Sequence, residues 1–184
     1  MFSITDVNFR SPSYDDAKSI FEIAKRQCGL SANSEEFYHL AASHFFGTCV
    51  LGELKNDLYG FLLGYERPNR PGSIFVWQML VVEGQPSREV FFKLLEQLIL
   101  RHSNTYPLLE VSVLVKHSDK SLKKSIEDFI SEYQLNLLKV PFIKKNSFRD
   151  GDPDARALFV ISSKSLIKDL STVIKTKSLK NPDD

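Results

Sequence analysis

The spacing of apolar residues predicts two helices near the start of the chain. In each, apolar side chains recur every three or four residues, which is the period of one helix face. The first helix ends by Gln27, and the second follows the cap residues Asn33 and Ser34 and ends before Gly47. A short strand at residues 7–10 precedes both helices.

Three apolar runs then predict consecutive strands at residues 48–54, 58–65 and 73–82. The short links between them contain turn-forming residues, which favours an antiparallel meander. The third run leads directly into an amphipathic segment at residues 87–101. A strand that feeds the N-terminus of a helix is a place where α/β proteins hold phosphate groups, because free backbone N–H groups point outward there.

The strand before this helix and the strand after it are predicted to be parallel. Residues 109–115 are almost continuously apolar, which is typical of a strand covered on both faces. The pattern ends with three more elements: a helix at residues 118–133 and strands at residues 135–143 and 157–162. The fold class is therefore α/β (α+β), with a mixed central sheet of about seven strands flanked by about four helices.

Composition mainly excludes classes of partner. The chain has 184 residues, of which 42% are hydrophobic, and this suffices for one domain at residues 1–163. We expect the lysine-rich tail, residues 164–184, to form a solvated helix and then a frayed end. The formal charge of +1 and the lack of a basic stripe argue against nucleic acid. No apolar run reaches the roughly 20 residues of a membrane helix, and no secretory signal is recognisable, so we expect a cytoplasmic protein without a membrane partner.

Cysteine and histidine positions do not indicate metal or thiol chemistry. Cys28 and Cys49 lie in different predicted elements and are expected to be reduced, partly buried thiols. His39 and His44 are five residues apart, which places them off a common helical face. We therefore expect no metal cofactor.

Five short sequence words stand out along the predicted elements: Asn33-Ser34, His44-Phe45 leading into Thr48, Gly60 through Tyr65, Phe75-Val76-Trp77-Gln78, and Leu109-Glu110. They match, in the same order, words of the diaminobutyrate acetyltransferases of ectoine synthesis, a family of GNAT N-acetyltransferases. The chain resembles this family from about Phe9 to Ile161. The predicted order of elements is also that of the GNAT fold, although a fold alone does not specify an activity.

The resemblance implies acetyl-CoA as co-substrate and, as acceptor, a primary amine of a small diamino acid such as L-2,4-diaminobutyrate. The transfer needs a neutral amine against the thioester carbonyl, a donor for the oxyanion and a proton route. In the family, the end of the strand before the phosphate-binding helix bonds the pantetheine through its backbone, which here means Met79, Leu80 and Val81. Ser87 and Arg88 would face the pyrophosphate at the helix N-terminus.

The phosphate-binding turn departs from the family pattern R/Q-x-x-G-x-G/A. Pro86 lacks an N–H, Glu89 brings a carboxylate toward the phosphates, and Phe91 places a large ring at a small-residue position. Arg88 would offset only part of this loss. In the simpler interpretation, Ser87 is an ordinary N-cap and Phe91 is an ordinary core residue.

At the site that would bind the acceptor amine, the sequence departs from the family motif at one position and matches it at others. The family motif L-D-x-N-S reads Leu30-Ser31-Ala32-Asn33-Ser34 here, so a serine stands where an aspartate would hold a cationic diamine. The candidate substrate-binding residues are Asn33, Ser34, Tyr38 and Trp77. Glu110 is the candidate catalytic residue, because a buried carboxylate beside the Trp77 strand could bind an ammonium or relay its proton through water.

Each of these residues also has a structural interpretation. Glu110 could be a carboxylate at the solvent boundary of a strand end, Trp77 a core aromatic, and Tyr38 a partly buried surface aromatic. Two hypotheses of function follow. The first is an N-acetyltransferase acting on a small amino-bearing substrate. The second is a catalytically inactive GNAT-fold binding or interaction protein that has lost acetyl-CoA turnover. A homodimer is compatible with either.

Overall fold

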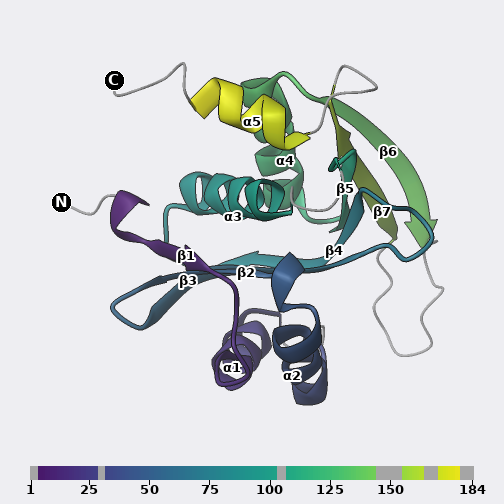
Figure 1. Cartoon of the computed structure of the whole chain (residues 1–184). Helices are drawn as coiled ribbons and strands as arrows, with labels where there is room; N and C mark the ends of the chain where they lie inside the picture. The colour runs from purple at the N-terminus through teal and green to yellow at the C-terminus, as the bar shows by residue number, and fades with distance from the viewer. Residues whose placement is uncertain (1–3, 29–31, 103–106, 144–154, 164–169, 179–184) are drawn as a thin grey trace. The chain divides into compact units, whose positions relative to one another are not determined.

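Seven strands form one mixed sheet, in the order β1-β2-β3-β4-β5-β7-β6, in the computed structural model of the chain (Figure 1). The structure describes residues 4–28, 32–102, 107–143, 155–163 and 170–178. The strands are β1 (Asn8–Arg10), β2 (Val50–Leu54), β3 (Asp57–Glu66), β4 (Ser73–Val81), β5 (Glu110–Lys116), β6 (Asn136–Ile143) and β7 (Arg156–Ser162). The helices are α1 (Asp16–Cys28), α2 (Glu35–His44), α3 (Ser87–Arg101), α4 (Lys120–Tyr133) and α5 (Leu170–Ser178). The predicted fold class is confirmed, and each predicted strand and helix before the tail has a counterpart within about two residues.

β4 and β5 are parallel neighbours, as the strand–helix–strand pattern around α3 predicts. Their ladder begins with Ser73 opposite Glu110 and ends with Val76 opposite Val113. Both strands are longer than this ladder, since β4 continues to Val81 and β5 to Lys116. The pairing therefore stops before β4 ends and leads into α3.

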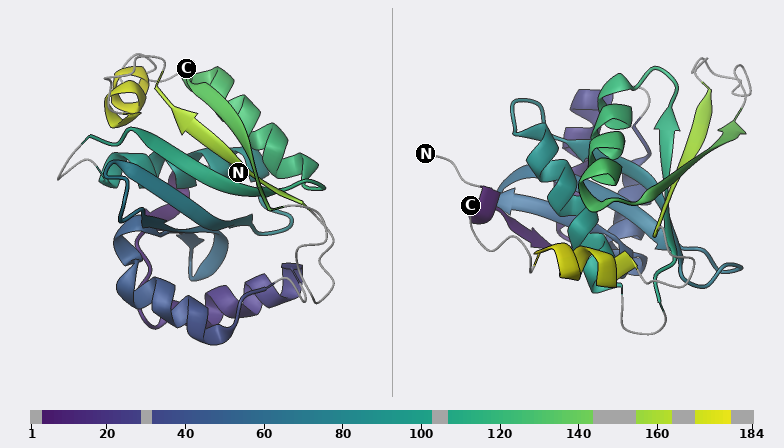
Figure 2. Two further views of the ribbon diagram at one scale, coloured as in Figure 1. Left: turned by 90° about the vertical axis from the view of Figure 1, so that its right-hand side faces the viewer. Right: turned by 90° about the horizontal axis from the view of Figure 1, so that it is seen from above.

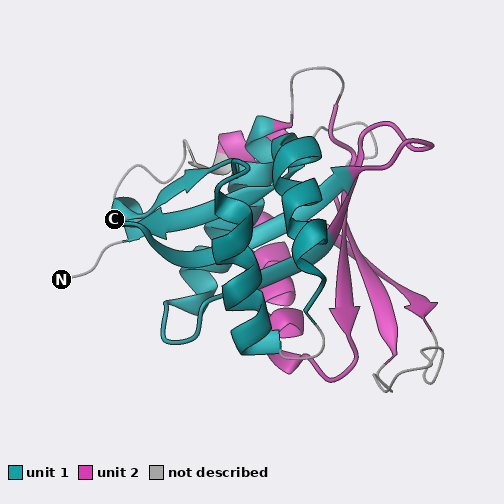
Figure 3. Ribbon diagram, turned by 90° about the horizontal axis from the view of Figure 1, so that it is seen from below, with its two compact units in different colours: residues 1–65, 77–101 teal, residues 66–76, 102–184 magenta. Residues whose placement is uncertain are grey.

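The chain divides into two compact units, residues 1–65 with 77–101 and residues 66–76 with 102–184 (Figure 3). β4 runs through both, since Val76 falls in one unit and Trp77 in the other. The predicted boundary between a domain at residues 1–163 and a tail stays a prediction.

In the first unit, helices cover both faces of strands β1, β2 and β3. α1 and α2 lie side by side on one face (Figure 2), where the buried core consists of Ala17, Ile20, Ala24, Tyr38, Ala41, Ala42, Cys49, Leu51, Phe61 and Leu63. α3 lies on the opposite face (Figure 1), in contact with β1 and β2. The position of α3 matters for function because its N-terminus follows directly from β4.

Gly60 on β3 sets how closely α3 approaches the sheet. A Cβ atom at this position would lie 2.8 Å from the carbonyl oxygen of Leu80, 2.9 Å from Val90 Cγ1 and 3.2 Å from Leu94 Cδ1. Such distances are too short for a side chain, so only glycine allows this contact between strand and helix. The glycine at the start of the Gly60–Tyr65 word thus has a packing reason.

Arg10 ties together three elements of the first unit. Its guanidinium donates to both carboxylate oxygens of Asp16 at the start of α1, each at 2.8 Å. It also donates to Glu53 on β2 at 2.8 and 2.7 Å. The hydrogen bonds from Arg10 lower the pKa of Asp16 to about 2. The same guanidinium lowers the pKa of Glu53.

This arrangement predicts a loss of stability in acid. A carboxyl group whose pKa is lowered by folding stabilises the protein above its unfolded pKa, and this contribution disappears as the pH falls toward the folded pKa. For Asp16 the window lies between about pH 4 and pH 2. We expect Asp16→Asn to lower the free energy of unfolding at pH 7 by about 1 kcal/mol after allowance for solvent screening, and by much less at pH 2.5, as measured by urea unfolding. An equal cost at both pH values would contradict the role of this ion pair, and Asp15→Asn at the exposed neighbouring position is the control.

In the second unit, β5, β7 and β6 form two antiparallel ladders, with β7 in the middle. Asp119 is the N-cap of α4, and its Oδ1 accepts a hydrogen bond from Leu122 N at 2.9 Å. The tail does contain a helix, α5, but the expectation that it is simply solvated is wrong. Leu170 and Ile174 are fully buried, because α5 packs against this unit through an apolar edge. Within the described ranges, no helix is both long and apolar enough to cross a membrane.

Candidate functional site

Three of the four predicted substrate-binding residues come together in the first unit. Asn33 precedes α2, Tyr38 lies on the first turns of α2, and Trp77 lies on β4. Gln78, the next residue of β4, joins them and completes one hydrogen-bonded cluster. Tyr38 is completely buried, whereas 43% of Trp77 is exposed. The interpretations of Tyr38 as a surface aromatic and of Trp77 as a core aromatic are therefore wrong.

The hydrogen bonds within this cluster all lead to the side-chain oxygen of Gln78, the final acceptor. Trp77 Nε1 donates to Asn33 Oδ1 at 3.2 Å, and Asn33 Nδ2 donates to Gln78 Oε1 at 3.1 Å. The Tyr38 hydroxyl also donates to Gln78 Oε1, at 3.0 Å, and accepts from the backbone N–H of Asn33 at 3.3 Å. Because an indole N–H can only donate, the oxygen of Asn33 must face Trp77, and this fixes the orientation of both amides.

The orientation of the Gln78 amide has a chemical consequence. Its oxygen accepts two hydrogen bonds, while its NH₂ group makes none with the described residues. Two N–H donors are therefore available to a bound molecule, and the group that they suit is a carboxylate or a carbonyl oxygen. The signal for Gln78 was present in the Phe75–Gln78 word. It was missed as a site residue because alternation along a strand places neighbouring side chains on opposite faces.

Neighbouring aromatic rings support the cluster. The Phe37 ring lies 5.8 Å from the Trp77 ring and 5.6 Å from the Tyr38 ring, between centroids. Burial raises the pKa of Tyr38, so its hydroxyl is neutral at pH 7 and keeps the proton that it donates to Gln78. Ser34, the fourth predicted residue, accepts a hydrogen bond from Phe37 N at 3.4 Å as the N-cap of α2. Its role in substrate binding stays a prediction.

Glu110, the predicted catalytic residue, lies in the second unit at the start of β5 and is only 8% exposed. Ser73 Oγ donates to Glu110 Oε1 at 2.7 Å. Arg67 and Arg70, from the turn between β3 and β4, pair with the carboxylate at 3.5 and 2.9 Å. The contacts of this carboxylate with two guanidinium groups and a hydroxyl favour a structural role.

This interpretation predicts the effect of Glu110→Gln. We expect the free energy of unfolding to fall by about 1–3 kcal/mol, since the substitution removes the charge that satisfies two cations and a hydroxyl. Urea unfolding of this variant, compared with Glu127→Gln in the exposed Lys139–Glu127 pair, would measure the effect. Unchanged stability with a large loss of turnover would instead support catalysis by Glu110.

The predicted pantetheine-binding residues form the last part of β4. Met79, Leu80 and Val81 lie beyond the end of the ladder between β4 and β5. Their strand ends at a hydrogen bond from Val82 N to Tyr59 O at 2.9 Å. Gly84, at a φ of 85°, then turns the chain toward α3. The assignment of Met79, Leu80 and Val81 to cofactor binding stays a prediction.

Several residues at the N-terminus of α3 depart from the phosphate-binding pattern of the family, and the structure shows where each of them lies. The carbonyl oxygen of Pro86 accepts the bond from Val90 N at 3.1 Å, so Pro86 is the residue before the helix and the N-cap interpretation of Ser87 is wrong. Phe91 is 2% exposed, which confirms that it is a core residue. Ser87, Arg88 and Glu89 are exposed in the first turn.

The first turn of α3 therefore combines backbone N–H groups that have no partner within the helix with one carboxylate. The Arg88 guanidinium lies 4.2 Å from the centre of the Phe92 ring, which directs it along the helix. The binding of a pyrophosphate by Ser87 and Arg88 stays a prediction. The altered motif positions Leu30 and Ser31 lie outside the described residues.

Other reactive groups do not form a site in the described part of the chain. Cys28 and Cys49 form no disulfide. Burial raises the pKa of Cys49 to about 11, which makes its thiol a poor nucleophile. No group of histidine, cysteine, aspartate and glutamate side chains among the described residues could hold a metal ion.

Comparison with known proteins agrees with the sequence words. No family model matches the chain. Over 106 residues the chain is 30% identical to the L-2,4-diaminobutyric acid acetyltransferase of Vibrio cholerae, which covers 58% of this chain and 59% of that protein. Over 151 residues it is 23% identical to the L-2,4-diaminobutyric acid acetyltransferase of Streptomyces avermitilis, which covers 82% and 84% of the two chains. The match thus spans less than two thirds of the Vibrio cholerae protein and about half the length of others with the same name.

The structure is similar to that of the diaminobutyrate acetyltransferase EctA of Paenibacillus lautus, solved in complex with L-2,4-diaminobutyric acid and coenzyme A. The TM-score is 0.78 at 23% identity, and the match covers 85% of this chain and 94% of that one. This likeness shows the fold, which is the GNAT fold expected from the order of elements. The resemblance to diaminobutyrate acetyltransferases is confirmed as a similarity of sequence and fold.

Proposed function

We propose that this chain is an N-acetyltransferase that moves an acetyl group from acetyl-CoA to a primary amine of a small diamino acid such as L-2,4-diaminobutyrate. The observation that carries the proposal is the cluster of Asn33, Tyr38, Trp77 and Gln78, which presents two amide N–H donors beside an exposed indole ring. The names of the similar proteins supply the class of substrate.

In this proposal, the cluster orients the acceptor. The Gln78 NH₂ group binds the carboxylate of the diamino acid, and the Trp77 ring lies against its short carbon chain. The hydrogen bonds from Asn33 and Tyr38 to Gln78 Oε1 hold the amide in place, so little freedom is lost on binding. The free amine then attacks the thioester carbonyl to form a C–N bond, and the C–S bond breaks. The proton that the amine loses balances the leaving thiolate, which ends as the thiol of coenzyme A.

Acetyl-CoA would use backbone groups of the same unit. Met79, Leu80 and Val81 bind the pantetheine, and the N–H groups of Ser87 and Arg88 meet the pyrophosphate. We also propose that the protein acts in the cytoplasm, and the fact that Cys28 and Cys49 form no disulfide supports a reducing compartment. A homodimer stays a prediction.

The experiment that tests the proposal mixes the protein with acetyl-CoA and one acceptor at a time. Release of the free thiol and the mass of the acetylated product would be measured for 2,4-diaminobutyrate, ornithine, lysine and 2-aminobutyrate. We expect acetylated 2,4-diaminobutyrate to accumulate faster than the others. Thiol release that no acceptor accelerates above the rate of acetyl-CoA alone would overturn the proposal.

A second candidate function rests on the first turn of α3. Glu89 is exposed there, next to the N–H groups that would bind phosphate, and Pro86 contributes no N–H. These features favour a GNAT-fold binding or interaction protein that has lost acetyl-CoA turnover. Calorimetric titration with acetyl-CoA separates the two functions, because the binding protein would retain affinity for the diamino acid alone.

A further inference from the structure

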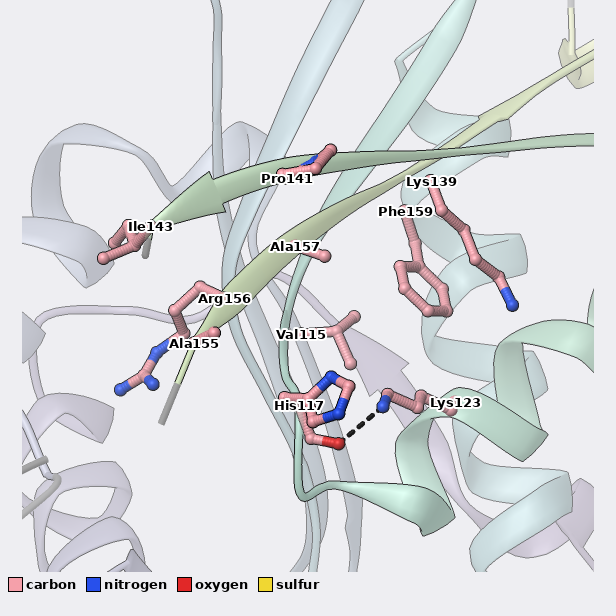
Figure 4. A pocket seen from close by; sticks show the side chains of 10 residues that line it. All are labelled: Val115, His117, Lys123, Lys139, Pro141, Ile143, Ala155, Arg156, Ala157 and Phe159. Atoms are coloured by element: carbon pink, nitrogen blue, oxygen red, sulfur yellow. Dashed lines mark hydrogen bonds between the residues drawn. The ribbon is translucent and has the colours of Figure 1, made fainter. Parts of the chain in front are cut away.

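The second unit contains a pocket that the proposed acetyl transfer does not use. Its volume is about 460 Å³, and it lies between the first turns of α4 and the strands β5, β7 and β6 (Figure 4). This size is within the range of small-molecule sites in proteins, which is roughly 300–1,000 Å³. The described residues that line it include four basic side chains and no acidic one.

The pocket has an apolar floor because of one small residue. Ala157 on β7 stands in register between Val115 on β5 and Pro141 on β6. The next position of β7 on this face is the buried Phe159, which also lines the pocket. A methyl group between larger neighbours leaves a hollow beside the aromatic ring, so the sequence of β7 itself creates the space.

Two lysine side chains line the pocket. Lys139 Nζ, from β6, is 5.0 Å from the centre of the Phe159 ring. Lys123 Nζ, from α4, donates to the carbonyl oxygen of His117 at 2.5 Å, which uses one of its three N–H bonds. Figure 4 shows Val115 and the Phe159 ring between these two lysines.

The Lys139 ammonium also pairs with Glu127 Oε1 at 2.8 Å. Both side chains of this pair are about half exposed, so the pair contributes little stability and can share its cation with a second anion. His117 and Arg156 add two further basic side chains to the lining. The described lining therefore combines three cationic side chains, of Lys123, Lys139 and Arg156, with an apolar floor.

We propose that this pocket binds a small carboxylate with an apolar chain or ring. The carboxylate pairs with Lys123 and Lys139, and its apolar body covers Val115, Ala157 and Phe159. Charge complementarity selects an anion over a cation, and the apolar floor selects a carboxylate with a hydrocarbon body over a fully hydrated one such as acetate. The site belongs to the second unit and is independent of the acetyl transfer proposed above.

The test is a calorimetric titration of the intact protein with octanoate, octan-1-ol, octylamine and acetate. We expect octanoate to bind most tightly, because it alone carries both features. The double substitution Lys123→Met with Lys139→Met should weaken octanoate binding by at least about tenfold. A loss of this size corresponds to at least one charge-assisted contact. Lys124→Met, an exposed position on the same helix that does not line the pocket, should leave it unchanged.

A second variant tests the floor without changing any charge. Ala157→Leu should fill the hollow and abolish octanoate binding, with circular dichroism and thermal unfolding as checks of the fold. Equal binding of octanoate and octylamine would overturn the proposal. So would unchanged octanoate affinity in the double lysine variant, or competition between octanoate and saturating coenzyme A.

Discussion

Acetyl-CoA is expected to bind this protein weakly, with a dissociation constant in the high micromolar range or above, because of the first turn of α3. Glu89 presents a carboxylate where the pyrophosphate would meet the free N–H groups, and Pro86 contributes none. One charge-assisted hydrogen bond is worth roughly 1.5–3 kcal/mol, and about 1.4 kcal/mol corresponds to tenfold in affinity. The two alterations together thus cost about two orders of magnitude.

Substitution of Glu89 tests this directly. We expect Glu89→Gln to strengthen acetyl-CoA binding about tenfold in calorimetric titration, since only the charge is removed. Restoring a small residue at Phe91 is not a useful second change, because this ring is buried and its loss would cost about 3–5 kcal/mol of stability. Glu22→Gln, at an exposed position of α1 on the other face of the sheet, is the control. Low-micromolar binding by the unaltered protein would show that other contacts hold the phosphates.

The fold followed from the sequence because its signals are local. A helical stripe of apolar residues at 87–101 and nearly continuous apolar runs on both sides of it are sufficient to predict a parallel strand–helix–strand unit. The structure has these elements, with α3 at the predicted bounds. The buried edge of α5 was not predicted, because Leu170 and Ile174 lie in a lysine-rich segment whose average character is polar.

The candidate site could be predicted less completely from the sequence, because its contacts connect distant parts of the chain. Arg67 and Arg70 pair with Glu110, and no local pattern around residue 110 indicates two cations from the preceding turn. Trp77 lies within the apolar run at residues 73–82, so the sequence left a core aromatic as the alternative to a binding role, and only the structure shows that its ring is partly exposed. Ser87 matched the residue type of an N-cap, but the chain enters the helix one position earlier, at Pro86.

The two halves of the proposed active site thus differ in what the structure implies for them. The hydrogen bonds among Asn33, Tyr38, Trp77 and Gln78 are complete, and they orient both amides. The phosphate end has free N–H groups but carries an opposing charge. A protein with this combination is expected to bind a diamino acid better than it binds acetyl-CoA. Measuring the two affinities separately is therefore more informative than measuring turnover alone.

The substitution Gln78→Glu is expected to abolish most of the affinity for 2,4-diaminobutyrate. A glutamate keeps the oxygen that accepts from Asn33 and Tyr38, so the cluster is preserved. The two N–H donors are replaced by a carboxylate oxygen, which repels the carboxylate of the ligand. Loss of a charge-assisted bond together with this repulsion should weaken binding by about 100-fold in calorimetric titration.

The matched ligand for this experiment is 1,3-diaminopropane, which is 2,4-diaminobutyrate without its carboxylate. If Gln78 binds that carboxylate, Gln78→Glu should leave the affinity for 1,3-diaminopropane unchanged or raise it, because the new charge attracts an ammonium group. Gln97→Glu on α3 is the control for the added charge. An equal loss for both ligands would mean that the variant has disturbed the Tyr38 and Asn33 contacts, and it would remove Gln78 from the proposed recognition of the substrate.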